Sequence, residues 1–329
     1  MAEEQRQRLI FMGTPAFAAT ILEKLLKTEE FDIVGVFCGP DKRLGRGMKL
    51  AACETKKLAL CYNLPIFQPV SLKNPEIVNA IGNSKPDFLV VAAYGMLIPQ
   101  EILDIPVKAA LNVHASLLPA YRGAAPIQRA IMENGQGTGK TGISIMKVVK
   151  ALDAGPVYAQ AEIAIGRHDR PSLERELAVL GADLLVDTLR ELAADKVQAL
   201  EQDEDKVTWA PKLEKRDGLI DWRKTVAEVD ALVRGVTPWP GARTSFMLLG
   251  RDGTIPVILT PGEPGEKEEN LQPGQIARVK NGLRIACADG WYIPGSVHPE
   301  GGREMGAADF ANGYCKVKTG LCGLAVNAK

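Results

Sequence analysis

Asn112, His114 and Asp153 are the residues of this chain whose types and placement best suit acid–base chemistry. An Asn amide donates a hydrogen bond to an oxyanion, a His donates or shuttles a proton, and an Asp orients the imidazole or accepts a proton. His114 is one of only three histidines, which makes it the leading candidate for a catalytic imidazole. The three groups would suit direct acyl transfer between two bound substrates, in which the enzyme contributes proximity and oxyanion stabilisation without a covalent intermediate.

Two other interpretations of these residues stand beside this one. Ser116 lacks the G-x-S-x-G elbow of a serine nucleophile, and no cysteine lies near a histidine in the sequence. An isolated histidine at the end of a strand more often has a structural role. The asparagine two residues away and the acidic turn at 152–156 favour catalysis over that role.

The elements that would position these residues alternate between strands and helices. An apolar run at 109–114 ends in the polar groups, turns sharply and leads into a helix at 124–134, which is where open α/β sheets place their sites. Short connections between strands and helices indicate parallel strands. The sequence therefore predicts a doubly wound, mostly parallel sheet. Its strands are expected at 8–13, 32–38, 65–67, 87–94, 109–114, 141–149 and 158–165, and its helices at 17–26, 54–62, 74–81, 124–134 and 172–192.

The character of the chain changes after an acidic stretch at 201–205, which we interpret as part of a linker. A single helix at 226–233 is followed by short β-type runs separated by Gly and Pro. This pattern predicts a small all-β unit, most simply a barrel. The runs lie at 242–249, 255–259, 274–279, 283–286 and 291–293.

Composition excludes several classes of protein. Lys plus Arg equals Asp plus Glu, at 40 each, so the net charge gives no sign of a nucleic-acid partner, although a local patch can still bind one. The six cysteines show no C-x-x-C spacing, which favours reduced thiols over a metal site or a disulfide framework. No apolar run reaches membrane-spanning length and the start does not read as a signal peptide, so we expect no membrane and a cytoplasmic location. The first strand lacks G-x-G-x-x-G and a P-loop lysine, which argues against a dinucleotide site.

Two loops allow both a functional and a structural interpretation. Residues 39–49 form a basic, glycine-rich loop, which is either a solvated surface loop or one that closes over an anionic partner such as a nucleic-acid backbone. Residues 94–97 follow a buried strand and either line a pocket for a flat aromatic ligand or belong to the core under a loop.

The stretch from Asn112 to Gln128 resembles the signature of the formyltransferases that use 10-formyltetrahydrofolate, in which Asn-x-His-x-Ser-Leu-Leu-Pro is followed by Arg-Gly. The continuation Arg-Gly-Ala-Ala-Pro-Ile-Gln is similar to the branch of that family that acts on methionyl-tRNA. Further stretches that resemble this branch lie at 12–18, 40–50, 92–99, 152–155, 220–222, 238–242 and 309–314.

The resemblance implies a fold, a reaction and partners. The fold would be a Rossmann-like catalytic domain over 1–195, a linker over 196–208 and an OB-like tRNA-binding domain over 209–329. The reaction would move a formyl group from 10-formyltetrahydrofolate, the co-substrate, to the α-amine of initiator methionyl-tRNA, for translation initiation. The enzyme would be a monomer that needs no metal.

The resemblance also implies roles for individual residues. Asn112, His114 and Asp153 would be catalytic. Folate would be bound by Tyr94, Gly95, Met96, Leu97, Ser116, Leu117, Leu118 and Pro119. The acceptor stem of tRNA would be contacted by Arg46 and, more weakly, by Lys42, Arg43 and Lys49.

The sequence departs from the family pattern at the aspartate turn, which usually reads Gly-Leu-Asp-Thr-Gly. Here Ala151 and Ala154 replace the first Gly and the Thr, which restricts φ at one position and removes a hydroxyl at the other. Ala16 stands where the family often has an acidic residue. Asp153 itself is kept, so we expect activity to be kept as well.

Other functions remain open from the sequence. A formyltransferase acting on an amino sugar or on glycinamide ribonucleotide would share the same site, and a formylfolate hydrolase would use water in place of the amine. The basic loop and the C-terminal unit, rich in Trp and Pro, argue against these. An inactive RNA-binding protein is disfavoured by the intact Asn112, His114 and Asp153, and the amine that accepts the formyl group would separate the rest.

Overall fold

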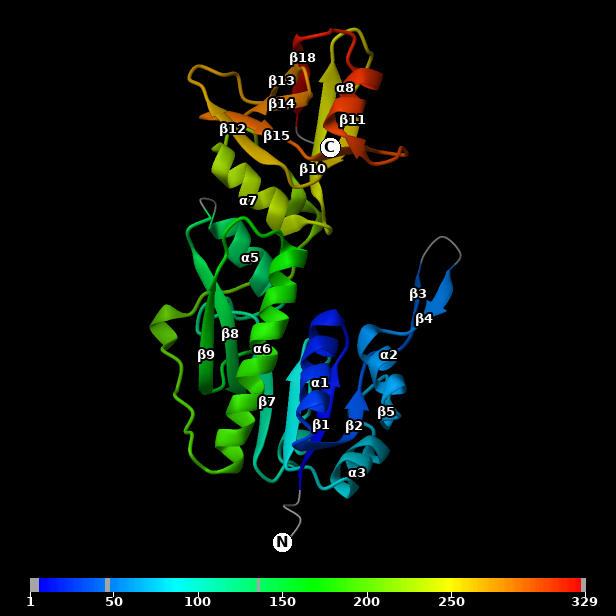
Figure 1. Ribbon diagram of the computed structural model, residues 1–329, viewed down its shortest axis with the longest axis vertical. Coiled ribbons are helices and arrows are strands. Elements are labelled where there is room, and N and C mark those ends of the chain that lie inside the picture. The colour runs from blue at the N-terminus through cyan, green and yellow to red at the C-terminus, as the bar shows by residue number, and fades with distance from the viewer. Residues whose placement is uncertain (1–5, 45–47, 135–136, 327–329) are drawn as a thin grey trace. The chain divides into compact units, whose positions relative to one another are not determined.

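The structure is a computed structural model, and it describes residues 6–44, 48–134 and 137–326. The chain divides into two compact units (Figure 1). The first, called here the α/β unit, comprises residues 1–123, 141–163 and 174–210. The second, the β unit, comprises residues 124–140, 164–173 and 211–329, so the chain passes between the units several times.

A seven-stranded sheet forms the centre of the α/β unit and confirms the predicted fold class. Its order is β5-β2-β1-β6-β7-β8-β9. The pairs from β5 to β7 are parallel, whereas β8 runs antiparallel to β7. The continuous apolar runs in β1 and β6 are buried on both faces, as expected for parallel strands. The strands are β1 (Gln7–Gly13), β2 (Phe31–Phe37), β5 (Ile66–Phe67), β6 (Phe88–Ala92), β7 (Ala109–His114), β8 (Lys140–Lys147) and β9 (Val157–Ala164).

Helices cover both faces of this sheet. Helix α1 (Ala16–Thr28) buries Phe17, Ile21 and Leu25, one face of a 3.6-residue period, and packs on β1, β2 and β6. The long helix α6 (Arg170–Ala193) approaches β7 and β8 closely at Gly181, where an added Cβ would lie 3.0 Å from Val113 Cγ1. Helices α3 (Pro75–Asn83) and α4 (Gln100–Leu103) pack on the apolar cluster that includes alternate residues of β1 and β6. Helix α2 (Glu54–Cys61) lies beside α1.

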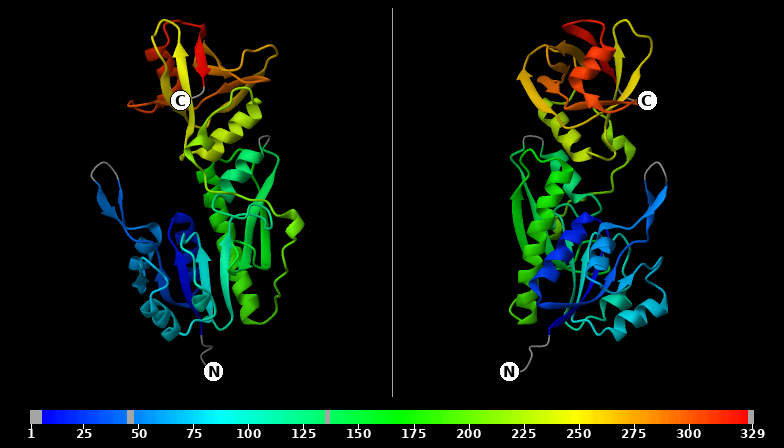
Figure 2. Two further views of the ribbon diagram at one scale, coloured as in Figure 1. Left: turned by 180° about the vertical axis from the view of Figure 1, so that it is seen from behind. Right: turned by 45° about the vertical axis from the view of Figure 1, so that its right-hand side comes forward.

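The predicted basic loop contains regular structure. Strands β3 (Lys42–Leu44) and β4 (Lys49–Ala51) pair antiparallel as a hairpin, visible in both views of Figure 2. At its base Lys56 Nζ donates to both carboxylate oxygens of Asp41, at 2.9 and 2.7 Å, and Gln68 Nε2 donates to Gly39 O at 2.7 Å. The prediction of a loop was therefore wrong for these two strands, because runs of only three residues are too short to give a β signal.

A nine-stranded antiparallel sheet forms the β unit and confirms the predicted change to β structure. Its order is β12-β15-β14-β13-β18-β10-β11-β16-β17. Its core is formed by buried side chains such as Trp222, Phe246, Tyr292 and Phe310. The strands are β10 (Ala242–Leu248), β11 (Ile255–Leu259), β12 (Glu263–Lys267), β13 (Gln275–Val279), β14 (Gly282–Ala286), β15 (Gly290–Ile293), β16 (Ser296–Pro299), β17 (Met305–Gly306) and β18 (Gly320–Val326).

Helices complete the β unit. Helix α5 (Pro126–Glu133) packs against α7 (Val226–Val236), which starts at a capping box formed by Thr225 and Glu228. Helix α7 confirms the predicted helix, whereas α8 (Ala307–Tyr314) and the strands β12, β16, β17 and β18 were not predicted. Within the described ranges, no helix is both long and apolar enough to cross a membrane.

Candidate functional site

Strand β7 places Asn112 and His114 at the carboxyl edge of the sheet. In the sheet, Asn112 lies opposite Val91 of β6, and His114 lies opposite Ser144 of β8. Because successive side chains of a strand alternate, Asn112 and His114 share one face of the sheet. The strand order reverses between β1 and β6, next to β7, and such a point is where open α/β sheets bind ligands.

The His114 ring is buried between two oxygen atoms. Its side chain is 6% exposed. Nε2 donates to the carbonyl oxygen of Tyr121 at 3.1 Å, and Nδ1 lies 3.7 Å from Oδ2 of Asp153. Both ring nitrogens therefore face oxygen atoms, and Nε2 is the one that donates a hydrogen bond. The structure thus brings two of the three predicted catalytic side chains together.

Asp153 lies in a turn between β8 and β9 that is held by several hydrogen bonds. Its φ of 50° is in the left-handed region, which a non-glycine residue adopts only when its surroundings hold it there. The backbone N–H of Gly123 donates to its Oδ2 at 2.9 Å. From the other side, Gln202 Nε2 donates to the carbonyl oxygens of Asp153 and Gly155, at 2.8 and 2.7 Å.

The predicted folate-binding residues 116–119 form an ordered loop after β7. Ser144 Oγ donates to Ser116 O at 2.7 Å and accepts from the N–H of Leu118 at 3.0 Å. Gln160 Nε2 adds a bond to Leu118 O at 2.8 Å. The Leu118–Pro119 peptide is cis, Ser116 and Leu118 are buried, and Leu117 and Pro119 are half-buried.

The other predicted folate residues follow β6, the parallel neighbour of β7. Tyr94 and Met96 belong to or pack on the apolar cluster of the core, whereas Gly95 is exposed and Leu97 is 82% exposed. The Tyr94 hydroxyl is buried and finds no hydrogen-bond partner in the described part of the chain. Burial raises the pKa of Tyr94, which keeps the phenol neutral.

The predicted tRNA-binding residues lie on or next to the hairpin β3–β4. Lys42 and Arg43 are exposed on β3. Lys49 begins β4, and its side chain lies outside the described structure. Arg46 also lies outside the described residues.

Three side chains that were not predicted as site residues lie beside the Asp153 turn: Arg122, Gln202 and Glu204. The Arg122 guanidinium is buried and donates to Gln202 Oε1 at 3.0 Å and to the Glu204 carboxylate at 3.2 and 2.7 Å. Arg122 was noted only as part of the family pattern. The other two lie in the acidic stretch interpreted as a linker, where no spacing distinguishes them.

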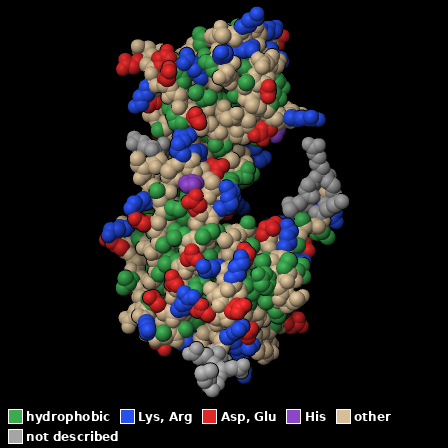
Figure 3. All heavy atoms as spheres, viewed as in Figure 1, with side chains coloured by type: hydrophobic (Ala, Val, Ile, Leu, Met, Phe, Trp, Pro, Cys, Tyr) green, Lys and Arg blue, Asp and Glu red, His purple; other side chains and the backbone are tan. Residues whose placement is uncertain are grey.

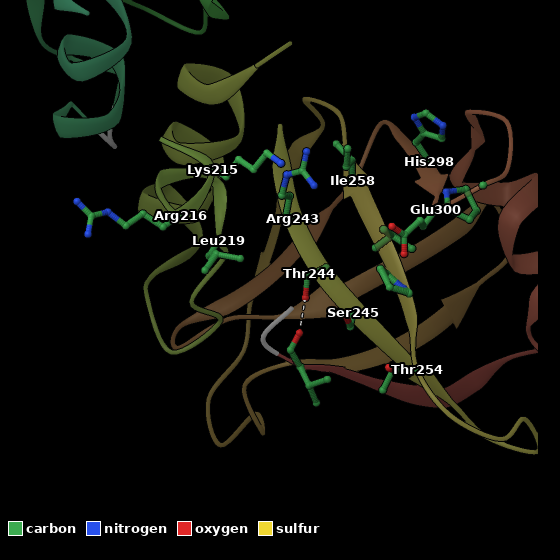
Figure 4. Close-up of a pocket in the computed structure, with 15 residues that line it drawn as sticks. Lys215, Arg216, Leu219, Arg243, Thr244, Ser245, Thr254, Ile258, His298 and Glu300 are labelled. Atoms are coloured by element: carbon green, nitrogen blue, oxygen red, sulfur yellow. Dashed lines mark hydrogen bonds between the residues drawn. The ribbon is translucent and has the colours of Figure 1, made fainter. Parts of the chain in front are cut away.

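Each unit contains a cavity. The smaller, of about 300 Å³, lies in the α/β unit and is lined by Leu118, Pro119 and Gln202 together with residues of β9. The larger, of about 780 Å³, lies in the β unit. Figure 4 shows that its cationic side chains come from η2 (Lys215–Gly218), which carries Lys215, and from β10, which carries Arg243. His298 and Glu300 line the opposite side of the same cavity (Figure 4).

Charge elsewhere is mixed. Basic and acidic side chains are interspersed over the face of the α/β unit seen in Figure 3, in keeping with a net charge of zero. In the part of the chain that the structure describes, no three His, Cys, Asp or Glu side chains are grouped so that they could hold a metal ion.

Comparison with protein families gives this site a class. Residues 7–189 match the family model described as formyl transferase, and residues 212–315 match its C-terminal domain. The chain therefore belongs to the formyl transferase family. It is 47% identical over 328 residues to the methionyl-tRNA formyltransferase of Desulfovibrio desulfuricans, an alignment that covers 98% of this chain and 97% of the relative. It is 39% identical to the protein of the same name from Methylococcus capsulatus, over 93% of this chain and 97% of that one.

Solved structures share the fold. HypX from Aquifex aeolicus in complex with tetrahydrofolic acid superposes with a TM-score of 0.63 at 18% identity, over 96% of this chain, which spans about half (51%) of HypX. An N-formyltransferase from Helicobacter canadensis, in complex with folinic acid and dTDP-3-aminofucose, gives a TM-score of 0.59 at 13% identity, over 92% of this chain and 100% of that one. These likenesses support the fold assignment alone.

Proposed function

We propose that this enzyme transfers the formyl group of 10-formyltetrahydrofolate to the α-amine of initiator methionyl-tRNA, which gives N-formylmethionyl-tRNA for translation initiation. The observation that carries the proposal is the His114–Asp153 pair at the carboxyl edge of the sheet, in a chain that aligns over nearly its whole length with methionyl-tRNA formyltransferases. We further propose that it works as a monomer in the cytoplasm, where its substrates are.

The chemistry follows from the side chains at the end of β7. The neutral α-amine attacks the formyl carbon, and its unperturbed pKa of about 7.7–8.0 means that little desolvation is needed to make it reactive. Asn112 and protonated His114 donate to the oxygen that becomes negative. The bond from carbon to the folate nitrogen then breaks, His114 supplies a proton to that nitrogen, and Asp153 takes the proton released by the amine.

The position of Tyr121 O suggests how the formyl oxygen is received. This carbonyl oxygen accepts the His114 Nε2 hydrogen at 3.1 Å. When the substrates bind, the ring exchanges this acceptor for the formyl oxygen, while Nδ1 keeps facing Asp153. Donors aimed at an oxygen that gains charge typically supply the largest single part of such catalysis.

Substrate binding is assigned to both units. Ser116 to Pro119 and Tyr94 to Leu97 hold the folate, since both stretches lie at the same edge of the sheet. Lys42, Arg43, Arg46 and Lys49 contact the acceptor stem. We divide the chain functionally into a catalytic domain over 1–195, a linker over 196–208 and a tRNA-binding domain over 209–329. The cations of its cavity, Lys215 and Arg243, supply sites for phosphate.

A formylation assay tests this proposal. The enzyme receives charged initiator tRNA and 10-formyltetrahydrofolate, with uncharged tRNA, free methionine and an amino-sugar nucleotide as alternative acceptors. We expect product only with the charged tRNA. His114→Ala and Asn112→Ala should each lower kcat by ~10²–10³. Formylation of the amino sugar instead would move the enzyme to another branch of the family, and near-normal turnover of both variants would overturn the assigned roles.

A further inference from the structure

Three side chains connect the Asp153 turn to a buried arginine. Arg122 is 3% exposed, and its Nε donates to Gln202 Oε1 at 3.0 Å while its terminal nitrogens donate to Glu204. Gln202 in turn donates to the carbonyl oxygens of Asp153 and Gly155. We call Arg122, Gln202 and Glu204 the clamp.

Thr208 and Ala210, which follow the clamp in the sequence, hold the segment that carries Tyr121 O, the other oxygen facing His114. Tyr121 N donates to Thr208 Oγ1 at 2.8 Å, and Arg122 N donates to Thr208 O at 2.9 Å. Ala210 N completes the contact by donating to Arg122 O at 2.7 Å. Both oxygens that face the His114 ring, Tyr121 O and Asp153 Oδ2, therefore belong to segments held by residues 202–210.

The amide of Gln202 is used completely in this arrangement. A primary amide offers one acceptor oxygen and two N–H donors. The oxygen accepts from Arg122, and the nitrogen donates to two carbonyl groups of one tight turn. Asp153 has a φ of 50°, a conformation that costs of order 1–3 kcal/mol and persists only when its surroundings hold it. The two carbonyl bonds supply that hold.

We propose that Gln202 is a positioning residue for the transfer reaction, an inference that rests on the proposed function. It acts through its two donor hydrogens, which hold the Asp153 turn so that the carboxylate faces Nδ1 of His114 and accepts from Gly123. Although Gln202 lines the same cavity as Leu118 and Pro119, its amide is engaged by Arg122 and by the Asp153 turn. Its loss displaces a catalytic group without removing a binding contact, so kcat falls and KM does not rise.

The variant Gln202→Glu isolates the donors. A glutamate has nearly the same shape and still accepts from Arg122, but when ionised it has no hydrogen to donate to the two carbonyl groups. We expect kcat for charged tRNA to fall by ~10- to 100-fold, with KM for tRNA and for folate unchanged. Asp205→Asn, on an exposed side chain of the same stretch that does not line this cavity, is the control and should leave both constants as in the wild type.

Hydrogen exchange at the Gly123 amide tests the clamp independently of any activity. This N–H donates to Asp153 Oδ2 at 2.9 Å. If the turn is released, the amide loses its acceptor and should exchange about tenfold faster in Gln202→Glu, and not in the control. Unchanged exchange overturns the inference whichever acceptor the wild type formylates, whereas faster exchange in an enzyme that fails to formylate charged tRNA places the fault in the proposed function.

The combined outcomes separate positioning from a merely structural role. Normal kcat in a folded Gln202→Glu enzyme overturns the inference, and so does a rise in both KM values with kcat unchanged. Should this variant fail to fold, Glu204→Ala loosens the clamp from its exposed end. It should then give smaller changes of the same sign in kcat and in Gly123 exchange, and wild-type values for both would overturn the inference.

Discussion

The site of the α/β unit and the cavity of the β unit hold polar groups in opposite ways. Around His114 the side chains of His114 and Arg122 are buried and donate hydrogen bonds to a backbone carbonyl and to a carboxylate, at 3.1 and 2.7 Å. In the β-unit cavity Lys215 and His298 are exposed at its rim, and Arg243 is half-buried. The first arrangement fixes buried atoms in space, whereas the second presents charged side chains at the surface, where Arg243 Nε donates to Pro240 O at 3.1 Å.

This difference indicates what each region can recognise. A fixed set of donors and acceptors suits one reaction geometry, since misplacement by about 1 Å can cost ~10²-fold in rate. Exposed cations suit a phosphate backbone, where attraction depends on the number of charges and falls with salt. Substitutions that change geometry should therefore harm the first region, and substitutions that remove charge should harm the second.

The largest contrast is expected between two glycines with positive φ. At Gly123, with φ of 130°, a Cβ would lie 2.6 Å from the carbonyl oxygen of Ala210. Gly123→Ala therefore strains the backbone and separates the segment that follows the clamp, which contains Ala210, from the residues beside Asp153. We expect ~2–5 kcal/mol of lost stability. At Gly253, with φ of 76° and open space around it, alanine should cost only ~1–2 kcal/mol. Denaturant unfolding of both variants measures the difference, and equal losses would remove the contrast.

Exchanging arginine for lysine should affect the two regions differently. Arg122→Lys keeps the charge but loses the forked contact with Glu204 and the bond to Gln202, which should cost ~1–3 kcal/mol and lower kcat. Arg243→Lys should leave tRNA affinity within about threefold, because a phosphate accepts either cation. Arg243→Ala should reduce the slope of log affinity against log salt by about one. Filter binding across a salt series checks these values, and a full loss of binding in Arg243→Lys would show directed recognition in the cavity.

The smallest effect is expected at Glu204, whose side chain is 72% exposed. Hydrogen bonds from Arg122 hold the pKa of Glu204 below its usual value, so the folded state favours the carboxylate. Stability from this pair is present above the unfolded pKa, about 4.3, and is lost as the pH falls through the lower folded value. The small Tm deficit of Glu204→Gln relative to wild type should therefore be present at pH 7 and vanish in acid. A deficit that stays constant over this range would mean that the charge plays no part.

Much of the fold could be predicted from the sequence because its signals are local. The apolar runs in β1 and β6 indicate buried parallel strands, and the polar ends of β7 and of the following turn place His114 and Asp153 on one edge. Their approach to 3.7 Å follows from that edge. The strand β12 (EPGEK) could not be found, since Gly, Pro and charge conceal it, and only its pairing with β15 makes it a strand.

The clamp could not be predicted for a different reason. Gln202 lies in an acidic stretch, and its partners Arg122 and Asp153 are 80 and 49 residues away. Hydrogen bonds between such distant residues leave no periodicity in the sequence. The assignments of folate and tRNA contacts stay predictions that the experiments above address.

The interleaving of the two units has a consequence for the order of events during synthesis. The α/β unit contains residues 174–210, and the β unit contains residues 124–140 and 164–173. A growing chain therefore exposes α5 long before α7, its packing partner, has been made. The hydrogen bonds of Gln202 with the Asp153 turn and of Thr208 with Tyr121 form only after residue 208 has been made, at about two thirds of the 329-residue chain.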